Sequence, residues 1–123
     1  MAPGTRGILN ALSPKYCNWS AIVDLDPKPP ILWTRGAQDI VVADGSPWEI
    51  GTLGQLGLIP GWPGEAAFAP QPMVSQIRAL FERYAAHGGR VESELFEGSG
   101  HFPPIDARER WSARFFGFLE TVE

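Results

Sequence analysis

The stretch at residues 31–39, ILWTRGAQD, is the part of the sequence that decides the fold. It opens with three consecutive apolar residues, and the prolines at positions 27, 29 and 30 exclude a helix before Ile31. An apolar run that does not alternate with polar residues is typical of a strand buried on both faces, as in parallel sheets. Gly36 ends the run, so Asp39 lies just beyond the predicted strand, at the start of a weaker apolar run over 39–42.

A second strand is predicted at residues 90–96, RVESELF. Every second residue from Val91 to Leu95 faces the same way, which is typical of a strand near an edge of a sheet. A turn of small residues, 98–100, follows this strand and ends at His101.

Two longer helices are predicted, one before and one after the second strand. The first begins at Pro72 and stops before Gly88, and its apolar residues recur at helical spacing: Met73, Ile77, Leu80, Phe81 and Tyr84. The second is capped by Asp106, with Glu109 completing a pattern like a capping box. Its apolar face is strongly aromatic and consists of Trp111, Phe115, Phe118 and Leu119.

The predicted order is strand, long loop, helix, strand, loop and helix. A strand–helix–strand unit with a right-handed crossover makes the two strands parallel neighbours. Parallel strands end at the same edge of a sheet, and active sites of open α/β sheets lie at that edge. We therefore expect Asp39 and His101, each of which follows a strand, to converge there.

A histidine held by a carboxylate is the base half of a nucleophile–His–acid arrangement. The carboxylate fixes the imidazole tautomer and stabilises the imidazolium that forms when the base takes a proton. Taken singly, Asp39 is better explained as a turn or cap residue, and His101 is explained equally well as a loop residue without a function. Their order and strand contexts together favour the catalytic interpretation. His87, in the last turn of a helix, is assigned a structural role.

The sequence resembles the C-terminal portion of the α/β-hydrolase family, over roughly residues 20–123. In that family the acid follows a late strand in a G-x-x-D context, matched here by residues 36–39, and the histidine follows the last strand in a G-x-G-H context, matched by residues 98–101. A closing amphipathic helix is matched by Phe115, Phe118 and Leu119, and the chain order of acid and histidine is also the family's. The resemblance implies an incomplete α/β-hydrolase sandwich: the last parallel strands with flanking helices.

The family's nucleophile has no counterpart in this chain. It sits on a G-x-S-x-G elbow well before the acid, and the 123 residues contain no such pattern. Ser99 lies between two glycines, but Glu97 and His101 stand where the elbow needs glycine, and Cys17 has no glycines around it. The resemblance therefore implies that residues 1–123 are the C-terminal portion of one α/β-hydrolase domain, with the nucleophile and the oxyanion-hole loop upstream.

The segment at residues 44–72 is rich in glycine and proline, yet it carries too many large apolar residues for a solvated loop: Trp48, Leu53, Leu56, Leu58, Ile59, Trp62 and Phe68. One interpretation is a lid or acyl-pocket wall above the site. Another is an insertion that packs on the sheet or on a neighbouring subunit, and a groove-binding peptide is the least favoured. Trp48 in this segment and Phe102 beside His101 are expected to contact substrate.

Composition limits the partners and the compartment. The net charge is −4 and the 10 Lys and Arg residues never cluster, so neither nucleic acid nor a membrane is expected as a partner. Cys17 is the only cysteine, which excludes an intrachain disulfide and a cysteine-based metal site. No apolar run near Met1 is long enough for a secretion signal, so a cytoplasmic location is expected. Short helices are expected at 5–13 and 17–25, and neither a cofactor nor a metal is expected.

The leading hypothesis is a hydrolase acting on an ester or a related small carbonyl substrate. His101 would be the general base and then the general acid, Asp39 would orient it, and the isolated chain would be inactive without a nucleophile. Two or three parallel strands leave an edge unpaired, so the expected partner is the remainder of the hydrolase fold or a second copy of the chain. The alternative is a non-catalytic interaction or assembly domain derived from the same fold.

Overall fold

The computed structural model describes residues 18–122. In chain order the elements are η2 (Trp19–Asp24), β1 (Ile31–Gly36), α1 (Ile50–Gln55), α2 (Met73–Ala86), β2 (Val91–Phe96), α3 (Pro103–Asp106) and α4 (Arg108–Leu119). The short helix predicted at 17–25 is present in its described part as the 3₁₀ helix η2, whereas the one predicted at 5–13 lies outside the described residues. Within residues 18–122, no helix has both the length and the apolar character needed to cross a membrane.

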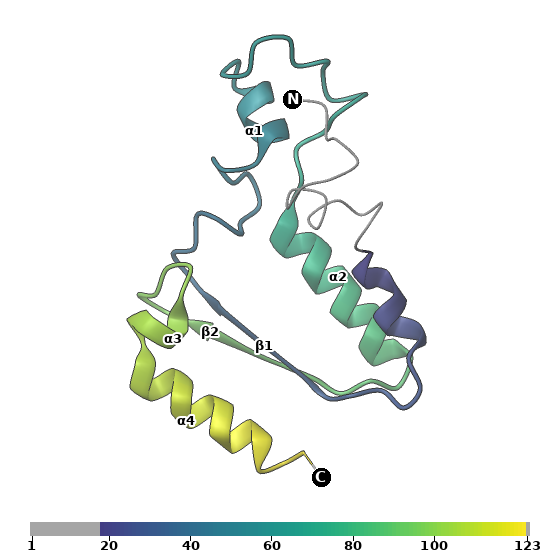
Figure 1. Ribbon diagram of the computed structural model, residues 1–123, viewed down its shortest axis with the longest axis vertical. Coiled ribbons are helices and arrows are strands. Elements are labelled where there is room, and N and C mark those ends of the chain that lie inside the picture. The colour runs from purple at the N-terminus through teal and green to yellow at the C-terminus, as the bar shows by residue number, and fades with distance from the viewer. Residues whose placement is uncertain (1–17, 123) are drawn as a thin grey trace, which may run out of the picture.

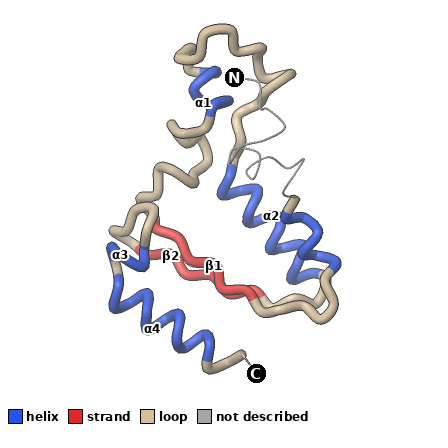
Figure 2. The backbone as a smooth tube through the Cα atoms, viewed as in Figure 1, coloured by secondary structure: helices blue, strands red, loops and turns tan. Residues whose placement is uncertain are grey.

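The two strands lie side by side and run parallel, as the sequence predicts (Figure 2). The register pairs Ile31 with Val91 and Gly36 with Phe96, so the strands end level with each other. The weaker apolar run at 39–42 forms bends, and the sheet of the described residues contains two strands. The segments that carry Asp39 and His101 therefore leave the sheet at the same edge.

The two longer helices cover opposite faces of this sheet (Figure 1). On one face, the rings of Trp33 in β1 and Phe81 in α2 meet edge to face, with centroids 5.6 Å apart. On the other face, the indole N–H of Trp111 in α4 donates to the hydroxyl of Thr34 at 3.1 Å. Because successive strand residues point to opposite faces, the neighbours Trp33 and Thr34 each serve one helix.

The two largest fully buried side chains belong to α2 and β2. Tyr84 and Phe96 are fully buried, and the Tyr84 hydroxyl donates to the Pro29 carbonyl at 2.5 Å. Gly89 lies so close to the Tyr84 ring that a Cβ at this position would come within 2.1 Å of a ring carbon. The glycine pair that ends α2, as predicted, thus also makes room for this ring.

Arginines of α4 meet glutamates of β2 on one face of the sheet. Arg110 donates to Glu94 at 2.7 Å and Arg114 donates to Glu92 at 2.5 Å. Such partly exposed pairs contribute about 1 kcal/mol or less each to stability. Charged residues along a strand are typical of sheet edges, and they agree with the prediction that residues 90–96 lie near an edge.

The prediction that Asp106 caps the last helix is wrong. The residue at the N-cap of α4 is Ala107, which makes no side-chain bond, and Asp106 ends the preceding short helix α3. The spacing to Glu109 resembles a capping box, but the Asp106 carboxylate accepts from the loop before His101 instead.

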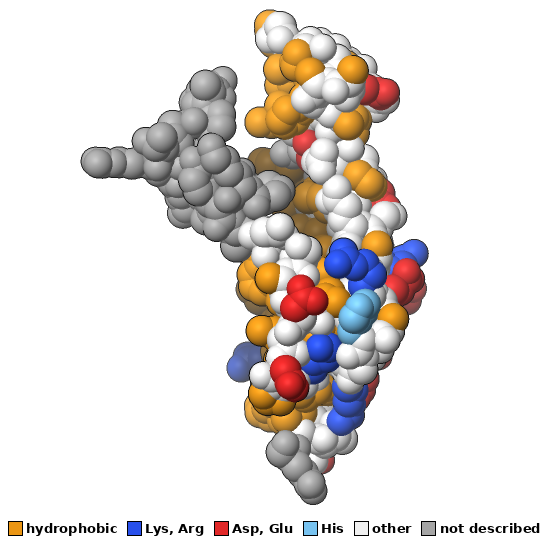
Figure 3. All heavy atoms as spheres, turned by 90° about the vertical axis from the view of Figure 1, so that its right-hand side faces the viewer, with side chains coloured by type: hydrophobic (Ala, Val, Ile, Leu, Met, Phe, Trp, Pro, Cys, Tyr) orange, Lys and Arg blue, Asp and Glu red, His pale blue; other side chains and the backbone are white. Residues whose placement is uncertain are grey.

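Residues 44–72, here called the arm, rise from the carboxyl end of β1 and contain α1 (Figure 1). Many of its close contacts are internal: Glu49 accepts from the backbone N–H of Thr52 at 2.7 Å, and Trp62 donates to the Phe68 carbonyl at 3.0 Å. Hydrophobic side chains dominate the end of the molecule where the arm lies (Figure 3). The arm leaves large apolar residues exposed, namely Trp48, Ile50, Leu56, Leu58 and Phe68.

Two carboxylates hold the base of the arm. Asp44 accepts from the Ser75 backbone N–H at 3.0 Å and from the Ser75 hydroxyl, in the first turn of α2. The N-cap residue of α2 is Pro72, which makes no side-chain bond, so Asp44 satisfies a helix N–H from outside the helix. Glu49 also accepts from the Gln71 backbone N–H at 3.2 Å, which ties the two ends of the arm together.

Few apolar side chains of the described residues are buried. The buried ones are Val23, Val74, Tyr84, Phe96, Pro103 and Phe118, whereas fourteen large hydrophobic residues are exposed. Parallel sheets in complete domains are covered on both faces and contain more than two strands. Residues 18–122 therefore have the layers of an α/β fold with only a small interior.

Candidate active site

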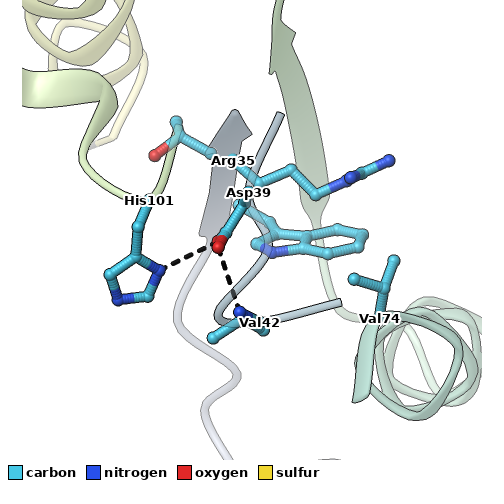
Figure 4. Close-up of a pocket in the computed structure, with 7 residues that line it drawn as sticks. Arg35, Asp39, Val42, Val74 and His101 are labelled. Atoms are coloured by element: carbon cyan, nitrogen blue, oxygen red, sulfur yellow. Dashed lines mark hydrogen bonds and ion pairs between the residues drawn. The ribbon is translucent and has the colours of Figure 1, made fainter. Parts of the chain in front are cut away.

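Asp39 and His101 meet at the carboxyl edge of the sheet (Figure 4). Asp39 follows β1 and His101 follows β2, and the distance between Asp39 Oδ2 and His101 Nδ1 is 2.9 Å. The two residues are 62 positions apart in the chain, so the parallel pairing of the strands is what brings them together. The expected convergence of this pair is thus present in the structure.

The other oxygen of the Asp39 carboxylate is held by the backbone. Oδ1 accepts from the N–H of Val41 at 2.8 Å and of Val42 at 3.0 Å, and the side chain is only 7% exposed. Burial raises the pKa of Asp39, but the hydrogen bonds from His101, Val42 and Val41 outweigh it and hold the pKa below its ordinary value. Asp39 therefore acts as a turn residue through one oxygen and as the partner of His101 through the other.

This arrangement sets the tautomer of His101. An ionised carboxylate only accepts hydrogen bonds, so Nδ1 of His101 carries the proton in the bond to Asp39. Nε2 then has a free lone pair, and the side chain is 35% exposed. A neutral imidazole in this state is able to take a proton through Nε2 while Asp39 stabilises the imidazolium that forms.

The loop before His101 crosses directly over the end of β1. A Cβ on Gly36 would come 2.0 Å from the Gly100 carbonyl oxygen and 2.2 Å from that of Ser99, so no side chain fits there. The same loop is bonded to the turn after β1, because the Gln38 N–H donates to the Ser99 carbonyl at 2.9 Å. Gly36 is thus the glycine that lets the two site loops touch.

Two residues that the sequence analysis did not assign to the site support its loops. Ser46 is fully buried, its hydroxyl lies 2.8 Å from the Ile40 carbonyl and 2.7 Å from that of Val41, and it holds the bends that follow Asp39. Asp106 accepts from the Ser99 hydroxyl and the Gly100 N–H. Both contact groups five to seven residues away in the chain, at spacings that helix and strand periodicity does not reveal.

A small pocket of about 150 Å³ opens beside the pair. Ligand sites are commonly about 300–1,000 Å³, so this is a partial wall rather than an enclosed site. Figure 4 shows the side chains that line it, which are Trp33, Thr34, Arg35, Asp39, Val42, Val74 and His101.

The residues expected to contact substrate lie outside this pocket lining. Trp48 is 70% exposed on the arm. Phe102 is also exposed, and its ring meets that of His101 edge to face with centroids 4.7 Å apart. Their assignment to substrate binding stays a prediction.

Of the two nucleophile candidates, only Ser99 lies within the described residues, and it is not placed for that role. Ser99 is 1% exposed and its hydroxyl donates to Asp106 at 3.1 Å, so it is not available to a substrate. Cys17 lies outside the described residues. In residues 18–122 no group of three or more His, Cys, Asp or Glu side chains is placed to hold a metal ion.

Comparison of the chain with models of protein families, with curated proteins and with solved structures finds no match. The site is therefore interpreted from its own geometry.

Replacing Gly36 with alanine should disrupt the site, because the new Cβ collides with the backbone of the His101 loop. We expect a loss of about 1–3 kcal/mol in the free energy of unfolding, measured by urea denaturation. Gly117→Ala is the matched control: a Cβ there meets no atom within 4 Å on helix α4, so this variant should gain about 0.5–1 kcal/mol. Equal effects of the two substitutions would contradict the close approach at Gly36.

The stabilisation that Asp39 provides should depend on pH. Its pKa is lower in the folded chain than in the unfolded chain, where an aspartate has a pKa of about 3.9. The stabilisation is therefore complete above that unfolded value and is lost as the pH falls through the lower folded pKa. Urea titrations of the wild type and Asp39→Asn should differ at neutral pH and converge in acid. A difference that stays constant with pH would show that the Asp39 pKa is not lowered on folding.

Proposed function

We propose that this chain supplies the acid and the base of a nucleophile–His–Asp triad in a hydrolase of the α/β-hydrolase type. The observation that carries the proposal is the bond between Asp39 and His101 at the carboxyl edge of two parallel strands. The proposed substrate is an ester or a related small carbonyl compound. Residues 1–123 would then be the C-terminal portion of one such domain, with the arm as a wall or lid.

In the proposed reaction with a Ser or Cys nucleophile, His101 takes the nucleophile's proton through Nε2 and later gives it to the leaving group. With an Asp nucleophile, His101 instead takes a proton from the water that hydrolyses the covalent intermediate. Asp39 keeps the proton on Nδ1 and stabilises the imidazolium by its negative charge, which the lowered pKa maintains at neutral pH. The nucleophile (Ser, Cys or Asp) and the oxyanion donors come from the remainder of the fold. Without them we expect the isolated chain to be inactive.

The partner that best fits this account is the remainder of the hydrolase fold. In the described residues the sheet has two strands, the pocket beside His101 is small, and large apolar side chains are exposed. Further strands beside β1 would satisfy its free edge and enlarge the wall around His101. Self-association through the same edge is the second proposed arrangement. We propose the cytoplasm as the compartment, in keeping with the single cysteine.

A second candidate function is a non-catalytic interaction or assembly domain that kept the fold and lost the chemistry. The exposed apolar residues of the arm favour it, because contiguous exposed apolar surface is typical of binding sites. The two candidates differ in one respect that is open to measurement: only the hydrolase requires His101 for turnover.

The test is the hydrolysis of short-chain p-nitrophenyl esters by the complete enzyme that contains residues 1–123. We expect His101→Ala to lower kcat/KM by about 10³-fold or more and Asp39→Asn by about 10²- to 10⁴-fold. His87→Ala is the matched control, since His87 lies at the end of α2 with Nδ1 bonded to the Arg83 carbonyl, and it should change the rate little.

The isolated chain should release no burst of p-nitrophenol from the same esters. A burst from the isolated chain would show that it holds its own nucleophile. Full activity of the complete enzyme carrying His101→Ala would reject the triad, whereas a wild type without esterase activity would favour the interaction domain.

A further inference from the structure

A second carboxylate holds the loop that presents His101. Asp106 Oδ2 accepts from the Gly100 backbone N–H at 2.9 Å and from the Ser99 hydroxyl at 3.1 Å. Gly100 is the residue directly before His101, so one of these bonds fixes the backbone from which the imidazole projects. Ser99 is almost completely buried, and losing its acceptor would leave a buried hydroxyl unpaired.

The loop is held on its other side by the turn that carries Asp39. The Gln38 N–H donates to the Ser99 carbonyl, and the bare Cα of Gly36 lets the carbonyls of residues 99 and 100 approach the end of β1. The loop thus lies between the Asp39 turn and Asp106. Its position relative to Asp39 is fixed by contacts from both sides.

The local structure aims Asp106 at this loop and not at α4. α3 begins with the buried Pro103, and its single turn is closed by the bond from the Asp106 N–H to the Phe102 carbonyl at 3.0 Å. This turn brings the chain back so that the Asp106 side chain reaches Gly100. The N-cap position of α4 belongs to Ala107, so helix capping does not explain the aspartate.

We propose that Asp106 is a positioning residue, which holds the backbone before His101 so that Nδ1 stays in register with Asp39. The consequence for catalysis rests on the proposed function of the Asp39–His101 pair. The positioning of His101 does not depend on the proposed function, because it can be followed through the tautomer of the imidazole and its proton on Nδ1. Misplacement of a reacting group by about 1 Å costs about 10²-fold in rate, so a loosened loop would matter to turnover.

The test compares Asp106→Ala with Asp106→Asn by nitrogen and proton NMR of the imidazole rings in the full chain. The asparagine retains an oxygen that accepts both bonds, whereas the alanine retains none. The chain has two histidines. His87 serves as an internal reference because its ring is bonded to the Arg83 carbonyl and not to the loop before His101. In the wild type we expect His101 to show a downfield proton on Nδ1, as in a bond to a carboxylate.

We expect Asp106→Ala to lose this His101 proton signal and to show a mixture of the two ring tautomers. The His87 signals should stay unchanged. Asp106→Asn should keep the His101 signal. Ser99→Ala should also keep it, since the bond from Gly100 remains. Asp106→Ser is the second variant, because its side chain is one bond shorter and cannot accept from both donors. It should behave like the alanine variant and covers the case in which Asp106→Ala does not fold.

An unchanged His101 signal in Asp106→Ala, or in Asp106→Ser if the alanine variant does not fold, would overturn the proposal. In the complete enzyme, Asp106→Ala should lower kcat about 10- to 100-fold, with Asp106→Asn close to the wild type. If Asp106→Ala loses the His101 signal but the wild-type protein has no esterase activity, the proposed function alone is rejected. Esterase activity with an unaffected His101 signal would reject the positioning role alone.

Discussion

The parallel pairing of β1 with β2 is the interaction on which the site depends. A parallel pair ends both strands at one edge, and the level register from Ile31–Val91 to Gly36–Phe96 places the two following loops within contact distance. Gly36 then allows the loop before His101 to cross the end of β1, which brings Nδ1 of His101 to 2.9 Å from Asp39. The helices α2 and α4 keep this pair of strands in place by packing on opposite faces (Figure 1).

Patterns in the sequence predicted the elements that depend on residues near one another in the chain. The prolines and the apolar run placed β1, helical spacing and the glycine pair placed α2, and the order of elements made the strands parallel. The role of Asp106 was missed because its two bonds go to a loop, and the spacing to Glu109 resembles a cap. Ser46 and the internal contacts of the arm were missed for the same reason: residues that become partners only in the folded chain leave no periodic signal.

The Asp39–His101 pair lies beside a small pocket and near exposed apolar surface. The Asp39 side chain is only 7% exposed and its pKa is lowered, whereas His101 lines a pocket of about 150 Å³. The apolar residues of the arm and the two-stranded sheet leave surface that further strands and helices would cover. In the proposed enzyme these parts supply the nucleophile, and the described residues supply a base whose tautomer is already set.

A double-mutant cycle tests the central interaction most directly. The free energies of unfolding of the wild type, Asp39→Asn, His101→Gln and the double variant would be measured by urea denaturation at neutral pH. If the two side chains are bonded as described, the cycle should give a coupling free energy of about 1 kcal/mol. Additivity of the two single effects within about 0.3 kcal/mol would contradict the pairing of Asp39 with His101.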